Sequence, residues 1–345
     1  MKQVEEIYWL RFYGCLAVFA FHLIDRIERN YLEHTILDLA RIPTVVGTPI
    51  FIFISIFLFS VRYRDEVPHH FLARRLKYIM IPYAVYGLIY SIAEYVRLLA
   101  SGENVGLVGH LTEYLLFAGW HGYFLIVAMQ FYLLFWCYSR FRLWRWLPAG
   151  PGLLLGAAVS ICWWGLFRYL NAEPPGYLHW IAPVGWIYLF FLAILLARYY
   201  PRLLQLPWLK HLSHPAWLVT MVAGIIVLSL LGQLEYSSKE TWVVPLFILA
   251  ALYGIPRLAE RKATPLVKRV NEASFGIYLA HPIFFSVVDF VSWQVEMPLW
   301  LYVLALAFVG MAGSIMLNNL AAKAEWSGML FGKKLQVTAV PAQKG

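Results

Sequence analysis

The sequence predicts an all-α protein, a polytopic bundle of helices in a membrane, and three observations lead to this prediction. Hydrophobic residues fill 61% of the 345 positions and charged residues only 14%, whereas an ordinary soluble domain carries about 25% charge. Mean hydropathy is +0.64. The apolar residues also form runs of about 20, the length that an α-helix needs to cross a bilayer, and too long for the strands of a membrane barrel.

Ten apolar runs are predicted to be membrane-spanning helices. They cover roughly 7–23, 44–61, 78–98, 114–138, 150–170, 179–198, 215–233, 241–256, 273–292 and 298–321. They form a single transmembrane domain, 1–322, which a cytoplasmic C-terminal tail, 323–345, follows. The three cysteines lie within apolar runs at no metal-ligand spacing, so we expect neither disulfides nor a metal site.

The basic residues predict the orientation of the bundle. Of the 28 lysines and arginines, 21 fall in the two termini and in the loops after the second, fourth, sixth and eighth helices. Six fall on the opposite side, and Arg11 lies inside the first helix. Because positive residues remain on the cytoplasmic side, both termini are predicted to be cytoplasmic. The net charge of +9 therefore reflects topology, and we expect the lipid bilayer, not nucleic acid, as the partner of these cations.

The first helix contains the segment RFYGCLAVFAFH, which begins with Arg11 and ends with His22. Eleven residues make three helical turns plus about 20°, so both side chains project from one face, about 16 Å apart along the axis. Cys15 and Val18 lie between them on that face. Each polar residue alone could snorkel to its own interface. Their shared face favours a position inside the bundle, with Arg11 toward the cytoplasm and His22 toward the outer side.

The third helix carries Glu94 at about the depth of His22, with Arg97 one turn beyond it. Two interpretations are open. Glu94 and Arg97 could form an ion pair on the helix surface, or the Glu94 carboxylate could orient His22 and stabilise its protonated form, as an acid–base histidine requires.

The fourth helix begins at the outer side with GWHGYF, which places His121 at its mouth. Tyr123 and Gln130 are seven residues apart and share a face. Aromatic residues at this depth are typical of any membrane interface. Gln130 is more informative, because a buried amide needs hydrogen-bond partners.

The ninth helix contains SFGIYLAHP, in which Ser274, Tyr278 and His281 fall on one face. Pro282 follows, and because proline has no amide hydrogen it frees the carbonyl of Tyr278. His281 is either a packed, hydrogen-bonded histidine or part of a functional site.

Basic residues Arg74, Arg75 and Lys77 precede the third helix. They are either cytoplasmic anchors or a binding site for the phosphates of a nucleotide-containing donor, since guanidinium groups bind phosphate well.

In combination these motifs resemble the acyltransferase-3 family. The resemblance consists of the Arg11-x10-His22 pair, the basic R-x-x-K element RRLK (74–77) before the third helix, the segment FIFIS ending at Ser55 and the SFGIYLAHP segment, in this topology. Within the family, the segments GTPIFIFIS, GWHGYFLIVAMQFYLL and LFGKK resemble the intercellular-adhesin polysaccharide membrane proteins. The chain departs from many members at Ile56, where they have glycine after the serine, and this bears on the width of a donor path.

The resemblance implies transfer of an acyl group, acetyl or succinyl, from a cytoplasmic acyl-CoA to a hydroxyl of an extracytoplasmic glycan such as poly-β-1,6-N-acetylglucosamine. It implies no bound cofactor, a bacterial cytoplasmic membrane as location, and the polysaccharide synthase machinery as a partner. His22 would be the base, oriented by Glu94. Arg74, Arg75 and Lys77 would bind the CoA phosphates, and Arg11 would either hold the pantetheine or donor end or pair with a partner near His281. Gln130, Tyr278 or His281 would donate a hydrogen bond to the thioester oxygen. His121, Tyr123 and Ser55 would complete the substrate-binding site.

A different function, export of the glycan, is also compatible with the resemblance. A glycan path would need wide, polar and aromatic walls across the whole membrane. Here the deep polar residues are few and follow a narrow line, which favours a slender acyl-pantetheine arm. Whether transfer is direct or passes through an acyl-histidine is left open by the sequence.

Overall fold

The protein is described here by a computed structural model, which covers residues 5–32, 34–63, 67–169, 178–199, 207, 211, 214–321 and 330–331. These residues form helices and the turns between them, and no strand occurs among them. The all-α prediction is confirmed. The predicted tail, 323–345, lies outside the described residues except at positions 330 and 331.

The helices follow the order of the predicted runs, and each of the ten runs coincides with at least one of them. The longer helices are α1 (Glu5–Asn30), α3 (Gly47–Arg62), α5 (Ile81–Ala100), α7 (Tyr123–Arg140), α8 (Ala149–Tyr169), α10 (Ile187–Tyr199), α12 (Pro215–Leu230), α13 (Val243–Ala259), α14 (Pro265–Val295) and α15 (Leu299–Ala321). The shorter ones are α2 (Thr35–Arg41), α4 (Phe71–Arg75), α6 (Leu107–Leu115) and α9 (Leu178–Ile181), and a π-helical turn, Leu76–Met80, joins α4 to α5. Within the described ranges, seven helical stretches are long and apolar enough to cross a membrane, and α12 and α13 are shorter apolar helices.

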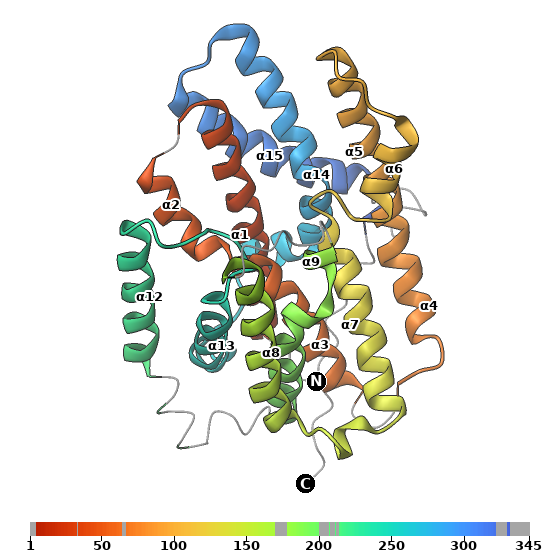
Figure 1. Cartoon of the computed structure of the whole chain (residues 1–345), viewed down its shortest axis with the longest axis vertical. Coiled ribbons are helices and arrows are strands. Elements are labelled where there is room, and N and C mark those ends of the chain that lie inside the picture. Colours follow the sequence, from red (N-terminus) through yellow and green to blue (C-terminus); the bar gives the residue numbers. More distant parts are fainter. Residues whose placement is uncertain are drawn as a thin grey trace.

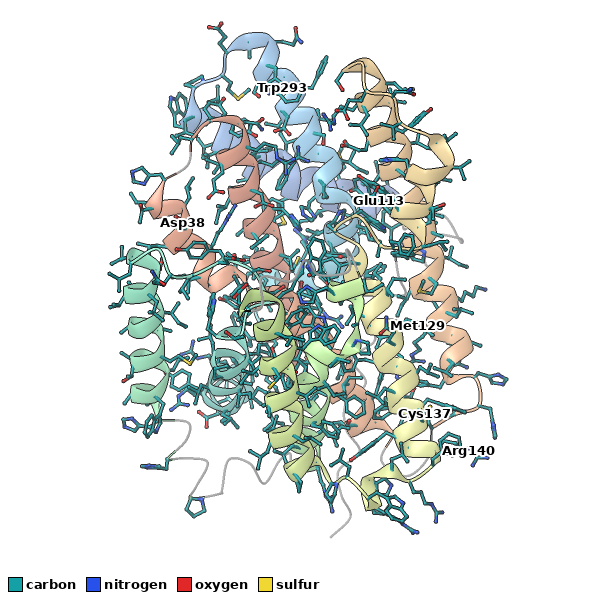
Figure 2. The ribbon with its side chains drawn as sticks, in the orientation of Figure 1. Asp38, Glu113, Met129, Cys137, Arg140 and Trp293 are labelled. Carbon is teal, nitrogen blue, oxygen red and sulfur yellow. The ribbon has the colours of Figure 1, made fainter. Side chains whose placement is uncertain are left out.

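The outer surface of the bundle is apolar, as lipid contact requires. Large hydrophobic side chains are extensively exposed on the outer helices, among them Leu154 on α8 (76%) and Phe308 on α15 (75%). In Figure 2, Arg140 lies at the lower end of α7 and Trp293 lies near the upper end of α14. The two residues were predicted on opposite sides of the membrane, and they lie at opposite ends of the molecule. Which end is cytoplasmic stays a prediction.

The predicted helix 114–138 is wrong at its start. α6 ends at Leu115 and α7 begins only at Tyr123. Between them, Ala118 has a left-handed φ of 54°, and Gly122 lies so close to the Trp120 ring that an added Cβ would come within 2.3 Å of it. The Trp120 ring therefore occupies the space that a side chain at residue 122 would take, and the turn leaves His121 in a loop.

The centre of the bundle is built from α1, which packs against both α14 and α3, while α15 packs on α14 (Figure 1). α3 approaches α1 closely at Gly47. A Cβ on Gly47 would lie 2.7 Å from Val18 Cγ2 and 3.0 Å from the Val18 backbone nitrogen. This small residue thus allows α3 to contact the part of α1 that leads to His22.

Candidate functional site

Three histidines from separate segments meet inside the bundle. His22 comes from α1, His121 from the loop before α7 and His281 from α14. Their ring centroids are 5.2 Å apart for His22 and His281, 5.7 Å for His121 and His281, and 5.8 Å for His22 and His121. His281 is fully buried, whereas the His22 side chain keeps 27% of its surface exposed. These residues, which we term the histidine cluster, were predicted from three different stretches of sequence.

The face of α1 between Arg11 and His22 looks into the bundle. Cys15 and Val18, which lie on that face, are only 3% and 8% exposed. The face of α1 that Arg11 and His22 share is therefore directed into the bundle, as predicted.

His281 is oriented by a hydrogen bond to the preceding turn of α14. α14 continues through Pro282, and the His281 side chain turns back along the helix, with Nδ1 2.8 Å from the carbonyl oxygen of Ile277. A carbonyl can only accept a hydrogen bond, so Nδ1 carries the proton and Nε2 of the neutral ring carries a lone pair. Nε2 is buried and has no hydrogen-bond partner. Neutral His281 therefore cannot donate from Nε2 to a thioester oxygen, and this corrects the expected donor role.

Two tyrosines fix the loop that carries His121. The Tyr278 hydroxyl donates to the backbone carbonyl of His121. Its hydrogen is therefore not free to bind a thioester oxygen. The Tyr90 hydroxyl donates to the Leu279 carbonyl over 2.6 Å, and the Tyr90 ring lies 4.9 Å from the His121 ring. The histidine cluster is thus held by α5 and α14 through hydrogen bonds to main-chain carbonyls.

The structure does not pair Glu94 with His22. The Glu94 carboxylate accepts two hydrogen bonds from Arg97, at 2.8 Å and 2.6 Å. The carboxylate near His22 is that of Asp25, whose Oδ2 is 3.9 Å from Nδ1 of His22. Asp25 is itself bound by Arg41, at 2.7 Å. Of the two interpretations of Glu94, the ion pair on the helix surface is the one observed.

A second group of polar residues lies on the Arg11 side of α1. The Tyr132 hydroxyl donates to Ser55 Oγ over 3.1 Å and interacts electrostatically with both Arg11 and Arg75. Among the described residues, no carboxylate forms a salt bridge with either arginine. Ile56, which follows Ser55, is fully buried. We call Arg11, Ser55, Arg75 and Tyr132 the inner basic group.

The three basic residues before the third predicted helix do not point the same way. The Arg75 guanidinium lies over the Phe71 and Phe59 rings, at 4.3 Å and 4.8 Å from their centroids. Arg74 and Lys77 are exposed. Only Arg75 of the three therefore joins the inner basic group.

Gln130 and Tyr123 face other partners than the histidine cluster. Gln130 Nε2 donates to the Ile181 carbonyl over 3.0 Å, which ties α7 to α9. Lys239 Nζ lies 4.7 Å from the centroid of the Tyr123 ring and 3.6 Å from the centroid of the Trp180 ring. Lys239 belongs to the loop between α12 and α13, and burial lowers the pKa of its ammonium group to about 7.

Sequence reasoning missed Asp25, Arg26 and Asp289. The Arg26 guanidinium forms a salt bridge with the Asp289 carboxylate, which is buried. Asp25 and Arg26 lie one turn beyond His22, and Asp289 lies two turns beyond His281. This helical spacing was the sequence signal that could have identified them. No three histidine, cysteine or acidic residues within the described ranges are placed to hold a metal ion.

Comparisons with known proteins give matches over most of the chain. The family model described as "Acyltransferase domain" matches residues 4–319. The "Putative membrane-bound acyltransferase YfiQ" of Bacillus subtilis is 28% identical over 99% of this chain and 97% of its own length. The "Probable poly-beta-1,6-N-acetyl-D-glucosamine export protein" of Staphylococcus aureus is 28% identical over 82% of this chain and 83% of its own, and the Staphylococcus epidermidis protein of the same name is 27% identical. No solved structure matches.

Proposed function

Since the chain belongs to the acyltransferase family whose model spans residues 4–319, we propose that it transfers an acyl group from a cytoplasmic acyl-CoA to a hydroxyl of an extracytoplasmic polysaccharide. The observation that carries this proposal is the geometry of α1. On one inward face, α1 carries both Arg11, which forms no salt bridge with a carboxylate among the described residues, and the partly exposed His22, as transfer between two sides of a membrane requires. The protein would act in the bacterial cytoplasmic membrane.

The donor side of the reaction falls to the inner basic group. Arg11 and Arg75 are half-buried, and a cation withdrawn from water is costly when no carboxylate pairs with it. No such carboxylate occurs among the described residues, so pairing with a ligand would offset that cost. Phosphate suits a guanidinium because it accepts two parallel hydrogen bonds. Arg75 would bind a CoA phosphate and Arg11 the pantetheine arm, with Tyr132 and Ser55 beside it.

The chemical step falls to the histidine cluster. His22 would take the proton of the acceptor hydroxyl as its oxygen attacks the thioester carbon. The carbon–sulfur bond then breaks, and the leaving thiolate takes up the proton from His22. A positioned base contributes about 10²–10⁴-fold, and the Asp25 carboxylate near Nδ1 would stabilise the imidazolium that forms.

The acceptor class is suggested by the staphylococcal relatives, whose printed names specify poly-β-1,6-N-acetyl-D-glucosamine. The stacked Trp180, Lys239 and Tyr123 side chains are a suitable surface for sugar rings, because aromatic side chains combine a broad apolar face with a polar tip. The same names favour a second function, export of the glycan.

The test is an assay with purified protein in liposomes. Radiolabelled acetyl-CoA or succinyl-CoA is supplied on one side and a β-1,6-linked glucosamine oligomer on the other. We expect label in the oligomer, and the donor that succeeds identifies the acyl group. If neither donor labels the oligomer, and the liposomes instead translocate it, export replaces acyl transfer as the function.

Two variants, each of which neutralises one carboxylate, distinguish the role of Asp25 from that of Glu94. Asp25→Asn is expected to lower kcat by about tenfold, because an imidazolium loses about 1.4 kcal/mol or more when a nearby opposite charge is removed. Glu94→Gln should leave kcat within about twofold, because an exposed i, i+3 pair with Arg97 is worth only a few tenths of a kcal/mol. The reverse order of effects would show that Glu94, not Asp25, serves His22.

A second pair of variants separates the neighbouring arginines. Arg75→Ala is expected to raise KM for acyl-CoA about tenfold or more, since a hydrogen bond to a charged group contributes about 1.5–3 kcal/mol. Arg74→Ala removes the same charge from an exposed position and should change KM by less than about threefold. Equal effects of the two variants would indicate a diffuse attraction for CoA instead of a binding site at Arg75.

A further inference from the structure

A buried polar network joins α1, α14 and α15 just beyond the histidine cluster. At its centre Asp289, which is 2% exposed, accepts hydrogen bonds from three side chains. These come from Arg26, from Asn30 Nδ2 at 3.2 Å and from the Tyr302 hydroxyl at 2.6 Å. Asn30 also donates to Tyr302 over 2.7 Å. Every polar atom named here is thus paired, so this network can hold the three helices in a fixed arrangement.

The network is continuous with the two helices that carry His22 and His281. Arg26 follows His22 by one turn of α1, and its second terminal nitrogen donates to Ser286 Oγ on α14 over 3.3 Å. Ser286 in turn donates to the Pro282 carbonyl over 3.0 Å, next to His281. The contacts between Arg26 and α14 therefore fix the rotation of α1 that brings the His22 and His281 rings to 5.2 Å.

Arg26 also affects His22 through its charge. Its cation interacts electrostatically with the His22 ring, as do those of Arg29 and Lys239. The other charged or titratable groups facing His22 are Asp25 on its own helix, His281 on α14 and His121 in the loop before α7. An uncompensated cation one turn away would oppose protonation of His22. The Asp289 carboxylate that pairs with Arg26 therefore favours protonation of His22.

We propose that Arg26 and Asp289 are a positioning pair for His22, in which Arg26 fixes the ring against α14 and Asp289 neutralises the cation that would otherwise keep His22 from accepting a proton. The inference rests on the proposed function only in that it takes His22 as the base. It identifies two residues that act through His22 and contact neither donor nor acceptor.

The test measures protonation of His22 without relying on catalysis. Diethyl pyrocarbonate modifies neutral histidine, and mass spectrometry of the His22 peptide gives the pH at which modification is half-maximal. Asp289→Asn is expected to move this midpoint about one unit to lower pH, because Arg26 loses its counter-charge. Arg26→Gln is expected to move it to higher pH, and the double variant should return it toward the wild-type value.

Control variants distinguish a charge effect of Arg26 and Asp289 on His22 from a purely structural role of the two residues. Glu103→Gln removes an exposed carboxylate beyond the end of α5 and should leave the midpoint unchanged. If Asp289→Asn does not fold, Arg26→Gln and the double variant still test the charge effect. Midpoints that coincide in all folded variants would overturn the proposal and leave a purely structural network. Failure of acyl transfer in the wild type, with the midpoints shifted as expected, would contradict the proposed function alone.

Discussion

Replacing His22 by glutamine is expected to lower kcat for acyl transfer by about 10²–10⁴-fold, the contribution of a positioned general base. Glutamine keeps a hydrogen-bonding group of similar size but cannot take the proton of the acceptor hydroxyl. KM for acyl-CoA should change little, because the inner basic group lies on the Arg11 side of α1, about three turns from His22. Initial rates in liposomes at varied acyl-CoA concentration measure both parameters.

The matched control for this variant is His110→Gln. His110 is a buried histidine on α6, and its ring contacts Tyr95 and Tyr114 instead of the histidine cluster. It should retain kcat within about twofold, because it has no part in the proton transfer. Full activity of His22→Gln would show that another group is the base, and His281, whose Nε2 already carries a lone pair, would be the first alternative to replace.

Much of this site could be predicted from sequence, because its elements depend on local periodicity. The eleven-residue spacing of Arg11 and His22 defines one helical face whatever packs against it. The apolar runs specify which residues are helical. The proline after His281 likewise acts locally, because it has no amide hydrogen to donate to the preceding turn.

The partners of the candidate residues could not be predicted in the same way. Glu94 has a possible partner on its own helix and another across the bundle, and sequence gives no rotation of one helix against the next. The salt bridge between Arg26 and Asp289 likewise joins residues 263 positions apart. Arg75 turns inward while Arg74 and Lys77 stay exposed. The π-helical turn at Leu76–Met80 also changes the angular spacing from Lys77 onward from the one that a regular helix predicts.

Substituting leucine for Gly47 is expected to lower the stability of the bundle by several kcal/mol and to reduce acyl transfer with it. Its Cβ would overlap Val18 Cγ2 at 2.7 Å and approach the Val18 backbone nitrogen at 3.0 Å. A side chain can rotate away, but the backbone cannot without moving α3 off α1, and overpacking of this kind costs about 1–3 kcal/mol or more. Because Val18 precedes His22 by one turn, the shift would also change the spacing of the histidine cluster.

Thermal unfolding in detergent and kcat in liposomes measure the two effects of this substitution. Gly109→Leu is the matched control, because an added Cβ on this glycine of α6 meets no atom within 4 Å. Gly47→Ala should fall between the control and Gly47→Leu, since it introduces the Cβ clash without the rest of the side chain. If Gly47→Leu and Gly109→Leu unfold at the same temperature, α3 does not depend on close contact with α1, and the histidine cluster must be held chiefly by α14.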